Sequence, residues 1–388
     1  MIKTLAIENY RSIRHLTLPM AALTLITGAN GSGKSNLYRS LKLLGSVAAG
    51  DIVSALAVQG GLSSSFWAGP EQFSRAMKHG EEPVQGGPSN RSKRLQLGFN
   101  LDEIGYAIAL GLPSGEGRSR FALDPQIKRE CIWAGEICRP ASLLLDRKAA
   151  MARSRQAESW QVVHQHLQPW DSVLTYTSDQ QLMPEAVQLR QYIASWRFYD
   201  ELRSDSQAPA RQVAIGTRTP CLAGDGHNLA AALQTIIEIG DEQALREAIR
   251  TAFEGAELSI DVSADTRFTV KLAMPGLLRP LTAAELSDGT LRFLMLAAAL
   301  LSPRPAPLLV LNEPEASLHP DLFRALAQLI HRATQDSQVW VVSHATRLIA
   351  ALDDEASCLT HHLERSLGET TVMGQQPLEQ PPWRWPSR

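Results

Sequence analysis

Apolar and polar residues alternate at several places along the chain, and each alternating run predicts a half-buried β-strand. The first such run covers residues 2–8, and a second apolar stretch, residues 15–27, ends in a glycine-rich sequence. Two further runs, 95–101 and 106–112, flank an Asp-Glu-Ile-Gly turn and predict a β-hairpin. We therefore expect the N-terminal part of the chain to be rich in strands.

The middle of the chain has a less regular pattern. Residues 119–145 are predicted as strand interrupted by prolines. The basic stretch 146–160 could touch phosphates, but a solvated surface helix or loop is the favoured prediction. The other elements expected here are a short strand at 172–177, a helix from Pro184, helices at 227–239 and 241–254, and a hairpin of 257–263 with 267–273. The helix from Pro184 would carry an apolar stripe formed by Leu189, Ile193, Trp196 and Tyr199.

From Leu281 onward, helical and strand patterns alternate along the chain. The predicted order is helix 288–301, strand 307–311, helix 320–334, strand 338–342, helix 345–352 and strand 357–363. Alternation of this kind predicts a parallel sheet covered by helices. The Pro-rich tail, residues 375–388, is expected to be extended or disordered.

Composition and charge exclude few classes of protein. The 38 basic and 40 acidic residues nearly balance, so net charge argues neither for nor against nucleic-acid binding. No apolar run approaches the roughly 18 residues of a membrane span, and the N-terminus lacks the apolar core of a signal peptide, so a cytoplasmic protein is predicted. The four cysteines lack C-x-x-C spacing, which favours reduced thiols over a zinc site or disulfides.

The strongest chemical signal is the sequence GANGSGKS, which follows the second apolar stretch and precedes a helical pattern. It fits the phosphate-loop motif at every fixed position, because glycines let backbone N–H groups surround a phosphate at a helix N-terminus. Lys34 would reach the outer phosphates, and Ser35 would ligate magnesium. The predicted nucleotide-binding residues are Gly28, Ala29, Asn30, Gly31, Ser32, Gly33, Lys34, Ser35 and Asn36. The chain is therefore predicted to bind ATP with Mg²⁺.

Three short sequences in the C-terminal part would complete such a site. An apolar strand ends in Asn312 and Glu313, where acidic residues beside a phosphate loop handle magnesium and the attacking water. The next strand ends in His344. Ser287 and Gly289 precede an apolar helix, and their hydroxyl and backbone groups predict an anion-binding helix N-terminus. Each sequence alone is a weak signal, and their order and spacing make the case.

This order of motifs resembles the ATP-binding-cassette ATPases of the SMC, Rad50, RecF and overcoming-lysogenization-defect type. The sequences ENYRSI, GANGSGKSN and NEPEASLHP carry the resemblance, which covers roughly residues 1–45 and 280–350. It implies an α/β ATPase head with a mixed sheet, an antiparallel β-subdomain and a helical lobe inserted between the two halves. The expected domains are an N-terminal half at 1–145, a mainly helical lobe at 146–256, a C-terminal half at 257–374 and the tail at 375–388.

The resemblance also implies roles for individual residues. Glu313 would be the base that polarises the attacking water, and His344 the switch histidine near the γ-phosphate. The other implied roles are Asn312 as a metal contact, Ser287 and Gly289 as contacts to the γ-phosphate of ATP held by a second subunit, Ser317 and Leu318 as the loop that crosses the dimer interface, and Gln180 or Gln181 as the glutamine loop.

One position departs from the pattern of the resembled family, which usually has aspartate before the catalytic glutamate. Asn312 occupies that position, and an amide brings no negative charge to magnesium. Hydrolysis is therefore expected to be slow or to need activation, with Glu315 as a neighbouring carboxylate that could compensate. Two features of related proteins are missing from the sequence, a long coiled coil and a C-terminal acidic cluster, so we expect neither a long-arm tether nor nuclease activity.

Two functions remain open at this point. The first is an ATPase whose ATP-dependent homodimerisation acts on DNA or on a separate nuclease or effector, in DNA repair or phage defence. The second is a nucleotide-sensing scaffold that dimerises on ATP with negligible turnover, which Asn312 favours. The L-S-D-G sequence and the strand-end histidine argue against a P-loop kinase, and ENYRSI argues against a transporter subunit.

Overall fold

The computed structural model describes residues 1–71, 73–79, 81–84, 93–113, 120–121, 123–157, 159–176, 182–353, 358–375 and 379–387. The chain forms two compact units, and each is described by itself. The first unit comprises Met1–Ala21, Gly28–Ser195 and His361–Arg388, and the second comprises Ala22–Thr27 and Trp196–Thr360. The domain boundaries expected from the sequence stay predictions.

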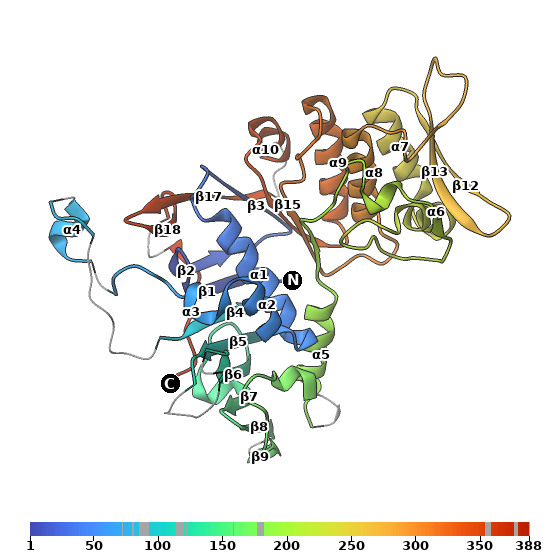
Figure 1. Cartoon of the computed structure of the whole chain (residues 1–388). Coiled ribbons are helices and arrows are strands. Elements are labelled where there is room, and N and C mark those ends of the chain that lie inside the picture. Colours follow the sequence, from blue (N-terminus) through green and yellow to red (C-terminus); the bar gives the residue numbers. More distant parts are fainter. Residues whose placement is uncertain are drawn as a thin grey trace. The chain divides into compact units, whose positions relative to one another are not determined.

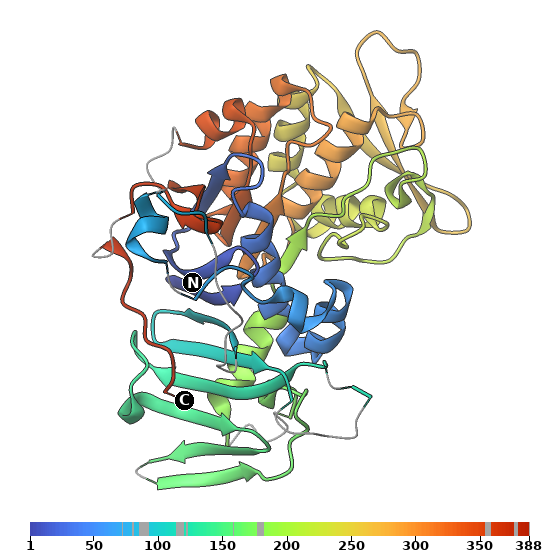
Figure 2. The ribbon, with the colours of Figure 1, turned by 60° about the vertical axis from the view of Figure 1, so that its left-hand side comes forward.

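An eight-stranded antiparallel sheet organises the first unit, and Figure 2 shows its teal and green strands side by side. Its strands, in spatial order, are β2 (Ile13–Pro19), β1 (Thr4–Tyr10), β4 (Leu95–Asn100), β5 (Ile104–Gly111), β6 (Gln126–Ala134), β7 (Leu143–Lys148), β8 (Met151–Gln156) and β9 (Ser159–His164). The predicted strand at 2–8 and the predicted hairpin, β4 with β5, are confirmed. The short helical turn η1 (Pro140–Ser142) joins β6 to β7.

The prediction of a surface helix or loop over residues 146–160 is wrong, because this stretch forms β7, β8 and the start of β9. Its charged side chains have partners inside the sheet. The Asp146 carboxylate accepts ion pairs from Arg129 at 2.9 Å and Arg153 at 3.0 Å. Arg147 is fully buried and lies 3.3 Å from the Glu130 carboxylate. Cross-strand pairing thus satisfies residues whose composition indicated a solvated surface.

The helices of the first unit are α1 (Lys34–Ala49), α2 (Ile52–Val58), α3 (Gly61–Ser65), α4 (Arg75–His79) and α5 (Pro184–Ala194), labelled in Figure 1. The strand predicted at 172–177 is instead the 3₁₀ turn η2 (Val173–Tyr176). Its start is held by the buried Glu130 carboxylate, which accepts the Val173 backbone N–H at 2.9 Å. The helix predicted from Pro184 is confirmed, but it ends at Ala194, so Trp196 and Tyr199 do not continue its apolar stripe.

The C-terminal segment from His361 onward completes the first unit. Strands β17 (Cys358–Ser366) and β18 (Glu369–Val372) pair antiparallel. The described tail residues 379–387 form neither α-helix nor strand, in line with an extended tail, yet they are packed rather than free. Trp383 meets Trp133 edge-on with ring centroids 5.5 Å apart, and a Cβ on Gly98 would lie 2.7 Å from the Trp383 ring. In Figure 2 the red C-terminal segment ends beside the teal strands.

A parallel sheet organises the second unit, as the alternating pattern predicted. Its spatial order is β10 (Arg197–Tyr199), β15 (Leu308–Asn312), β16 (Gln338–Val342) and β3 (Leu23–Gly28), of which β3 belongs to this unit up to Thr27. The helices are α6 (Leu229–Ile239), α7 (Glu242–Ala252), α8 (Asp288–Leu300), α9 (Phe323–Ala333) and α10 (Thr346–Asp353), with 3₁₀ turns η3 (Pro209–Arg211) and η4 (Pro320–Leu322). The predicted helices and strands of this part are confirmed.

A small antiparallel sheet forms a second layer of this unit, with β11 (Ala214–Ile215), β13 (Arg267–Ala273) and β12 (Glu257–Val262) in that order and β14 (Leu281–Thr282) paired to β13. Its inner residues join one continuous apolar core with α6, α8, α9 and the parallel strands. The chain is thus a mixed α/β protein. Within the described residues, every helix is too short or too polar to cross a bilayer.

Candidate nucleotide site

The phosphate loop runs from the end of β3 to the start of α1, and its backbone requires glycine. Gly28, Gly31 and Gly33 have φ angles of 143°, 81° and 109°. Residues with a Cβ rarely adopt these positive values, whereas glycine adopts them readily. A Cβ on Gly28 would lie 2.3 Å from the Leu363 carbonyl oxygen, and one on Gly33 would lie 2.0 Å from Thr370 Oγ1. The loop therefore fits closely against the β17–β18 hairpin at two of its glycines.

The polar groups of the loop suit a bound phosphate. Helix α1 begins at Lys34, its N-cap Gly33 offers no side-chain acceptor, and its first turn lacks an acidic residue, so neither a capping side chain nor a carboxylate opposes an anion at this helix end. The buried Lys34 ammonium donates to the carbonyls of Gly28 at 2.6 Å and Ala29 at 3.1 Å. The Ser32 hydroxyl is buried and has no hydrogen-bond partner among the described residues. These donors fit the charge of a triphosphate.

A series of hydrogen bonds from Asn36 through the hydroxyl groups of Ser12 and Thr370 supports the backbone of the phosphate loop; we call it the hydroxyl chain. Asn36 Nδ2 donates to Ser12 Oγ at 2.8 Å, and Ser12 Oγ lies 2.7 Å from Thr370 Oγ1. Thr370 Oγ1 in turn donates to the Ser32 carbonyl at 3.0 Å. The Asn36 amide, predicted to touch the nucleotide, thus also anchors this chain. Thr370 carries no motif that sequence reasoning could have used.

In the second unit, the parallel strands end together at one edge of the sheet. Asn312, the last residue of β15, is in register with Val342, the last residue of β16. The Glu313 N–H donates to the Val342 carbonyl at 2.8 Å, and the Ser343 N–H donates to the Ile26 carbonyl of β3 at 3.1 Å. The chain passes from β3 directly into the phosphate loop.

The two predicted catalytic side chains lie together at this edge. His344 Nδ1 is 3.7 Å from Glu313 Oε1, and both side chains are about half exposed, at 53% and 48%. Glu313 has a φ of 48° and Ser317 a φ of 64°, and both are left-handed conformations that cost energy in residues other than glycine. Strained backbone of this kind concentrates at functional loops, which supports a role for residues 313–317.

Glu315 has a role that the sequence did not indicate. Its side chain is 5% exposed, and its Oε1 accepts the Ser343 hydroxyl at 2.7 Å and the backbone N–H groups of His344 at 3.0 Å and Ala345 at 3.3 Å. The carboxylate thereby fixes the backbone that carries His344. Its suggested compensation for the missing charge at Asn312 stays a prediction.

A buried arginine accompanies this group. Arg292 of α8 donates to the Glu313 carbonyl at 3.4 Å and also to the Leu202 carbonyl. Burial lowers the pKa of the Arg292 guanidinium, and the charge of Glu315 acts in the opposite direction. The guanidinium therefore ties the start of the strained loop to the helix that begins at the L-S-D-G sequence.

The L-S-D-G sequence forms the N-terminus of α8. Ser287 is the N-cap, and its Oγ accepts the Thr290 N–H at 3.1 Å and lies 2.8 Å from Thr290 Oγ1. Gly289 packs tightly against the predicted interface loop, since a Cβ at this position would lie 2.9 Å from the Ser317 carbonyl oxygen. The predicted anion-binding terminus and the loop of Ser317 and Leu318 are thus neighbours within one chain.

The remaining predicted residues are placed as follows. Ala29, Asn30 and Ser35 are exposed on the phosphate loop and the first turn of α1. Gln180 and Gln181 lie outside the described residues. The structure gathers Gly28–Asn36 in the first unit and Ser287, Gly289, Asn312, Glu313 and His344 in the second.

Comparisons with known proteins bear on the fold and on the family of the chain. The SMC head domain from Thermotoga maritima is 14% identical over 97% of this chain and 99% of its own, with a TM-score of 0.49. An SMC head bound to the C-winged helix domain of ScpA is 14% identical over 96% of each chain, with a TM-score of 0.50, and this likeness shows an SMC-head fold. No curated protein matches the chain.

The family profile that matches residues 23–350 is AAA_21, described as "AAA domain, putative AbiEii toxin, Type IV TA system". The matched segment contains the phosphate loop, the L-S-D-G sequence, Glu313 and His344. This chain belongs to the AAA_21 family of P-loop ATPase domains.

Proposed function

We propose that this protein hydrolyses ATP and that ATP joins two copies of it into a dimer that switches a partner protein. The observation that carries the proposal is the contact of Glu313 with His344 at 3.7 Å, at the strand edge from which β3 leads into the phosphate loop. Phosphoryl transfer to water needs a residue that orients the attacking water, which Glu313 would supply, and a donor to the γ-phosphate, which His344 would supply.

The phosphate loop would bind the triphosphate. The N-terminus of α1, the Lys34 ammonium and the buried Ser32 hydroxyl supply donors to phosphate oxygens. Ser35 and Asn312 would hold Mg²⁺, which offsets phosphate charge and orients the γ-phosphate when it is bound. Lys34 would exchange its carbonyl partners for phosphate oxygens, which are stronger acceptors.

Glu313 would then orient and polarise the attacking water. The water oxygen bonds to the γ-phosphorus, the bond to the β-phosphate oxygen breaks, and the water proton passes by way of the Glu313 carboxylate to solvent or product. The products are ADP and inorganic phosphate. His344 would donate to the γ-phosphate, and Glu315 keeps its backbone in place for this contact.

The exposed N-terminus of α8 suggests why dimerisation would be part of the cycle. Ser287 is exposed, and its hydroxyl together with the backbone of Gly289 would face an anion. In the resembled ATPases, these groups contact ATP held by a second copy. The family description names a toxin–antitoxin system, and one similar SMC head binds a winged-helix domain of another protein. The bound winged-helix domain favours a protein as the partner, and the family description favours a role in phage defence.

Replacing Glu313 with glutamine tests the catalytic assignment. Glu313→Gln keeps the size of the side chain but removes the base, so turnover is expected to fall about 100-fold or more, while ATP-dependent dimerisation remains. Phosphate release and size-exclusion profiles with MgATP measure the two effects. Glu247→Gln, on the exposed face of α7, is the matched control and should leave both unchanged. Wild-type turnover in Glu313→Gln would exclude Glu313 as the base.

A nucleotide-sensing scaffold is the second candidate, and Asn312 is the observation that favours it. An amide at the end of β15 gives magnesium a weaker ligand than a carboxylate. Phosphate release from the wild-type protein, measured with and without double-stranded DNA, separates the two functions. ATP-dependent dimers without phosphate release under either condition would support the scaffold, and DNA-stimulated release would support an ATPase that acts on DNA.

A further inference from the structure

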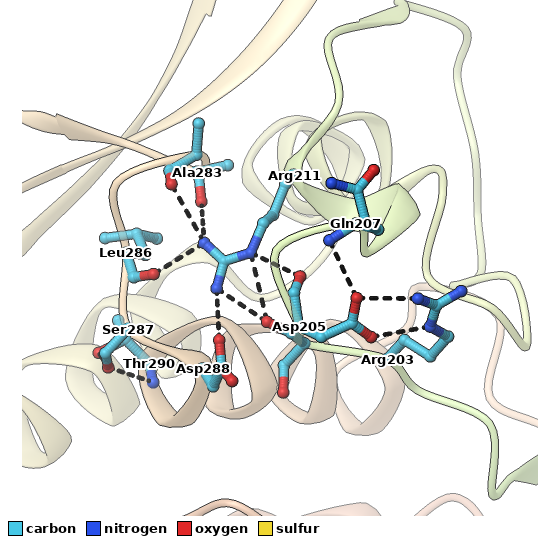
Figure 3. A network of polar contacts seen from close by, with 11 residues as sticks. Arg203, Asp205, Gln207, Arg211, Ala283, Leu286, Ser287, Asp288 and Thr290 are labelled. Carbon is cyan, nitrogen blue, oxygen red and sulfur yellow. Dashed lines mark hydrogen bonds and ion pairs between the residues drawn. The ribbon is translucent and has the colours of Figure 1, made fainter.

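A buried arginine holds the loop that leads into the L-S-D-G helix. We call residues 283–288 the signature loop. Arg211, the last residue of η3, extends its guanidinium into this loop, and its side chain is 7% exposed although its partner Asp288 is 55% exposed (Figure 3). The two residues are 77 positions apart in the sequence. Nothing in the motif pattern marked Arg211.

The guanidinium uses each of its three nitrogens on backbone carbonyls. Nη1 donates to three carbonyls of the signature loop, those of Ala283 at 2.9 Å, Ala284 at 3.3 Å and Leu286 at 2.8 Å. Nη2 and Nε donate to the carbonyls of Ser204 at 2.8 Å and Asp205 at 2.9 Å. Because the guanidinium is planar and rigid, its bonds to several carbonyls at once fix the curvature of the signature loop.

Residues 203–207, which precede Arg211 in the chain, are held by side-chain hydrogen bonds of their own. Arg203 forms a bidentate ion pair with the Asp205 carboxylate, with both N···O distances at 2.8 Å. The same carboxylate accepts the Gln207 N–H at 2.9 Å. Figure 3 shows these groups beside one another along the same loop. The carbonyls that face Arg211 thus belong to an ordered turn, and the guanidinium links this turn to the signature loop.

The negative charge of Asp288 at the N-terminus of α8 would oppose the binding of a phosphate there. Its carboxylate stands at the first helical residue of α8, between Ser287 and Gly289, where the proposed function places a γ-phosphate. An acid stabilises an empty helix N-terminus but repels a phosphate there. Arg211 Nη2 lies 2.7 Å from Asp288 Oδ1, which draws the carboxylate into an ion pair and offsets its charge.

We propose that Arg211 is the positioning residue of the signature loop: it shapes the loop through its carbonyls and neutralises Asp288, so that the N-terminus of α8 can accept the γ-phosphate of ATP bound to a second copy of the chain. This inference rests on the proposed ATP-dependent dimer. It assigns the control of that dimer to a residue that touches neither nucleotide nor magnesium.

The test measures ATP-dependent dimerisation of the full chain in the Glu313→Gln background, which retains ATP. Arg211→Gln is expected to weaken dimerisation about tenfold or more, while binding of a fluorescent ATP analogue to the monomer stays unchanged. Asp288→Asn alone should dimerise at least as well as the parent. The double variant Arg211→Gln/Asp288→Asn should recover part of the loss, because no carboxylate then remains to repel the phosphate.

Two controls separate this role from a general loss of structure. Arg218→Gln removes an exposed ion pair with Glu238 in the same unit and should leave dimerisation unchanged. Arg211→Lys keeps the charge with fewer donors and should lose less than Arg211→Gln, so it carries the test if Arg211→Gln does not fold.

The outcomes are distinct. Parent-like dimerisation of Arg211→Gln, or of Arg211→Lys where only that variant folds, overturns the positioning role alone. A double variant no better than Arg211→Gln overturns the charge-neutralising role. A parent that does not dimerise with ATP overturns the proposed function, and this inference with it.

Discussion

Two helices of this protein, α1 and α8, present N-terminal ends that suit a phosphate, and the two ends are built differently. At α1, Gly33 caps the helix with backbone alone, and the described first turn carries no acid. At α8, Ser287 caps the helix with its side chain, and the first residue is the acidic Asp288, held by Arg211. One end is therefore ready for an anion by its local sequence, and the other depends on a distant side chain.

This difference suggests a division of labour. A site made by glycine geometry binds whenever the loop is folded, because nothing in it has to be neutralised first. A site that contains its own carboxylate binds an anion only while that carboxylate has a partner. The phosphate loop would thus hold ATP in a single copy, and the signature loop would be the point where dimerisation is controlled.

The largest expected effect comes from the glycine geometry. Gly33→Ala places a Cβ 2.0 Å from Thr370 Oγ1 at a φ of 109°, so the loop must move, and ATP affinity should fall about 100-fold or more. Gly31→Ala is the matched control. Its φ is also positive, at 81°, but a Cβ there meets no described atom within 4 Å, so only backbone strain of about 1–2 kcal/mol is added.

Calorimetric titration of both variants with ATP checks this prediction. Equal losses in the two variants would show that strain at positive φ, and not the close fit against Thr370, makes the loop depend on glycine. Equal losses would therefore weaken the distinction drawn between the two helix ends.

A smaller effect is expected from the hydroxyl chain behind the phosphate loop. Thr370→Val keeps the shape but removes the donor to the Ser32 carbonyl, so ATP affinity should fall about fivefold, in line with a net hydrogen-bond contribution of about 1 kcal/mol. Thr371→Val is the control, since Thr371 Oγ1 is buried without a partner among the described residues. If both variants bind ATP equally well, the hydroxyl chain does not support the loop.

The sequence predicted those parts of the fold whose pattern is local. In the hairpin of β4 and β5 and in the helices α6 and α7, apolar residues recur with the period of a strand or a helix, and the structure confirms these elements. Residues 146–160 were misassigned because their arginines have cross-strand partners, such as Asp146 for Arg153, that only the folded sheet provides. The helix from Pro184 was extended too far, because Tyr199 shares its spacing by coincidence and lies on β10.

In the candidate site, too, the sequence predicts the contiguous residues but not those that are distant in the chain. The phosphate loop was recognised because Gly28 to Ser35 are contiguous and each residue type has its own chemical reason. Thr370 lies 338 positions from the Ser32 carbonyl that it supports, and Arg211 lies 77 positions from Asp288. Neither residue belongs to a motif, so only the fold could reveal what they contact.

The central claim is that one ATP site takes its phosphate loop from one copy and its signature loop from another. Mixing two inactive variants tests this claim most directly. Lys34→Ala removes the phosphate-binding ammonium, and Ser287→Arg fills the exposed N-terminus of α8, so neither protein alone should release phosphate. In a two-fold symmetric dimer, equal mixing gives about half heterodimers, each with one intact site of two, so about a quarter of wild-type phosphate release is predicted. A mixture as inactive as its components would contradict the account.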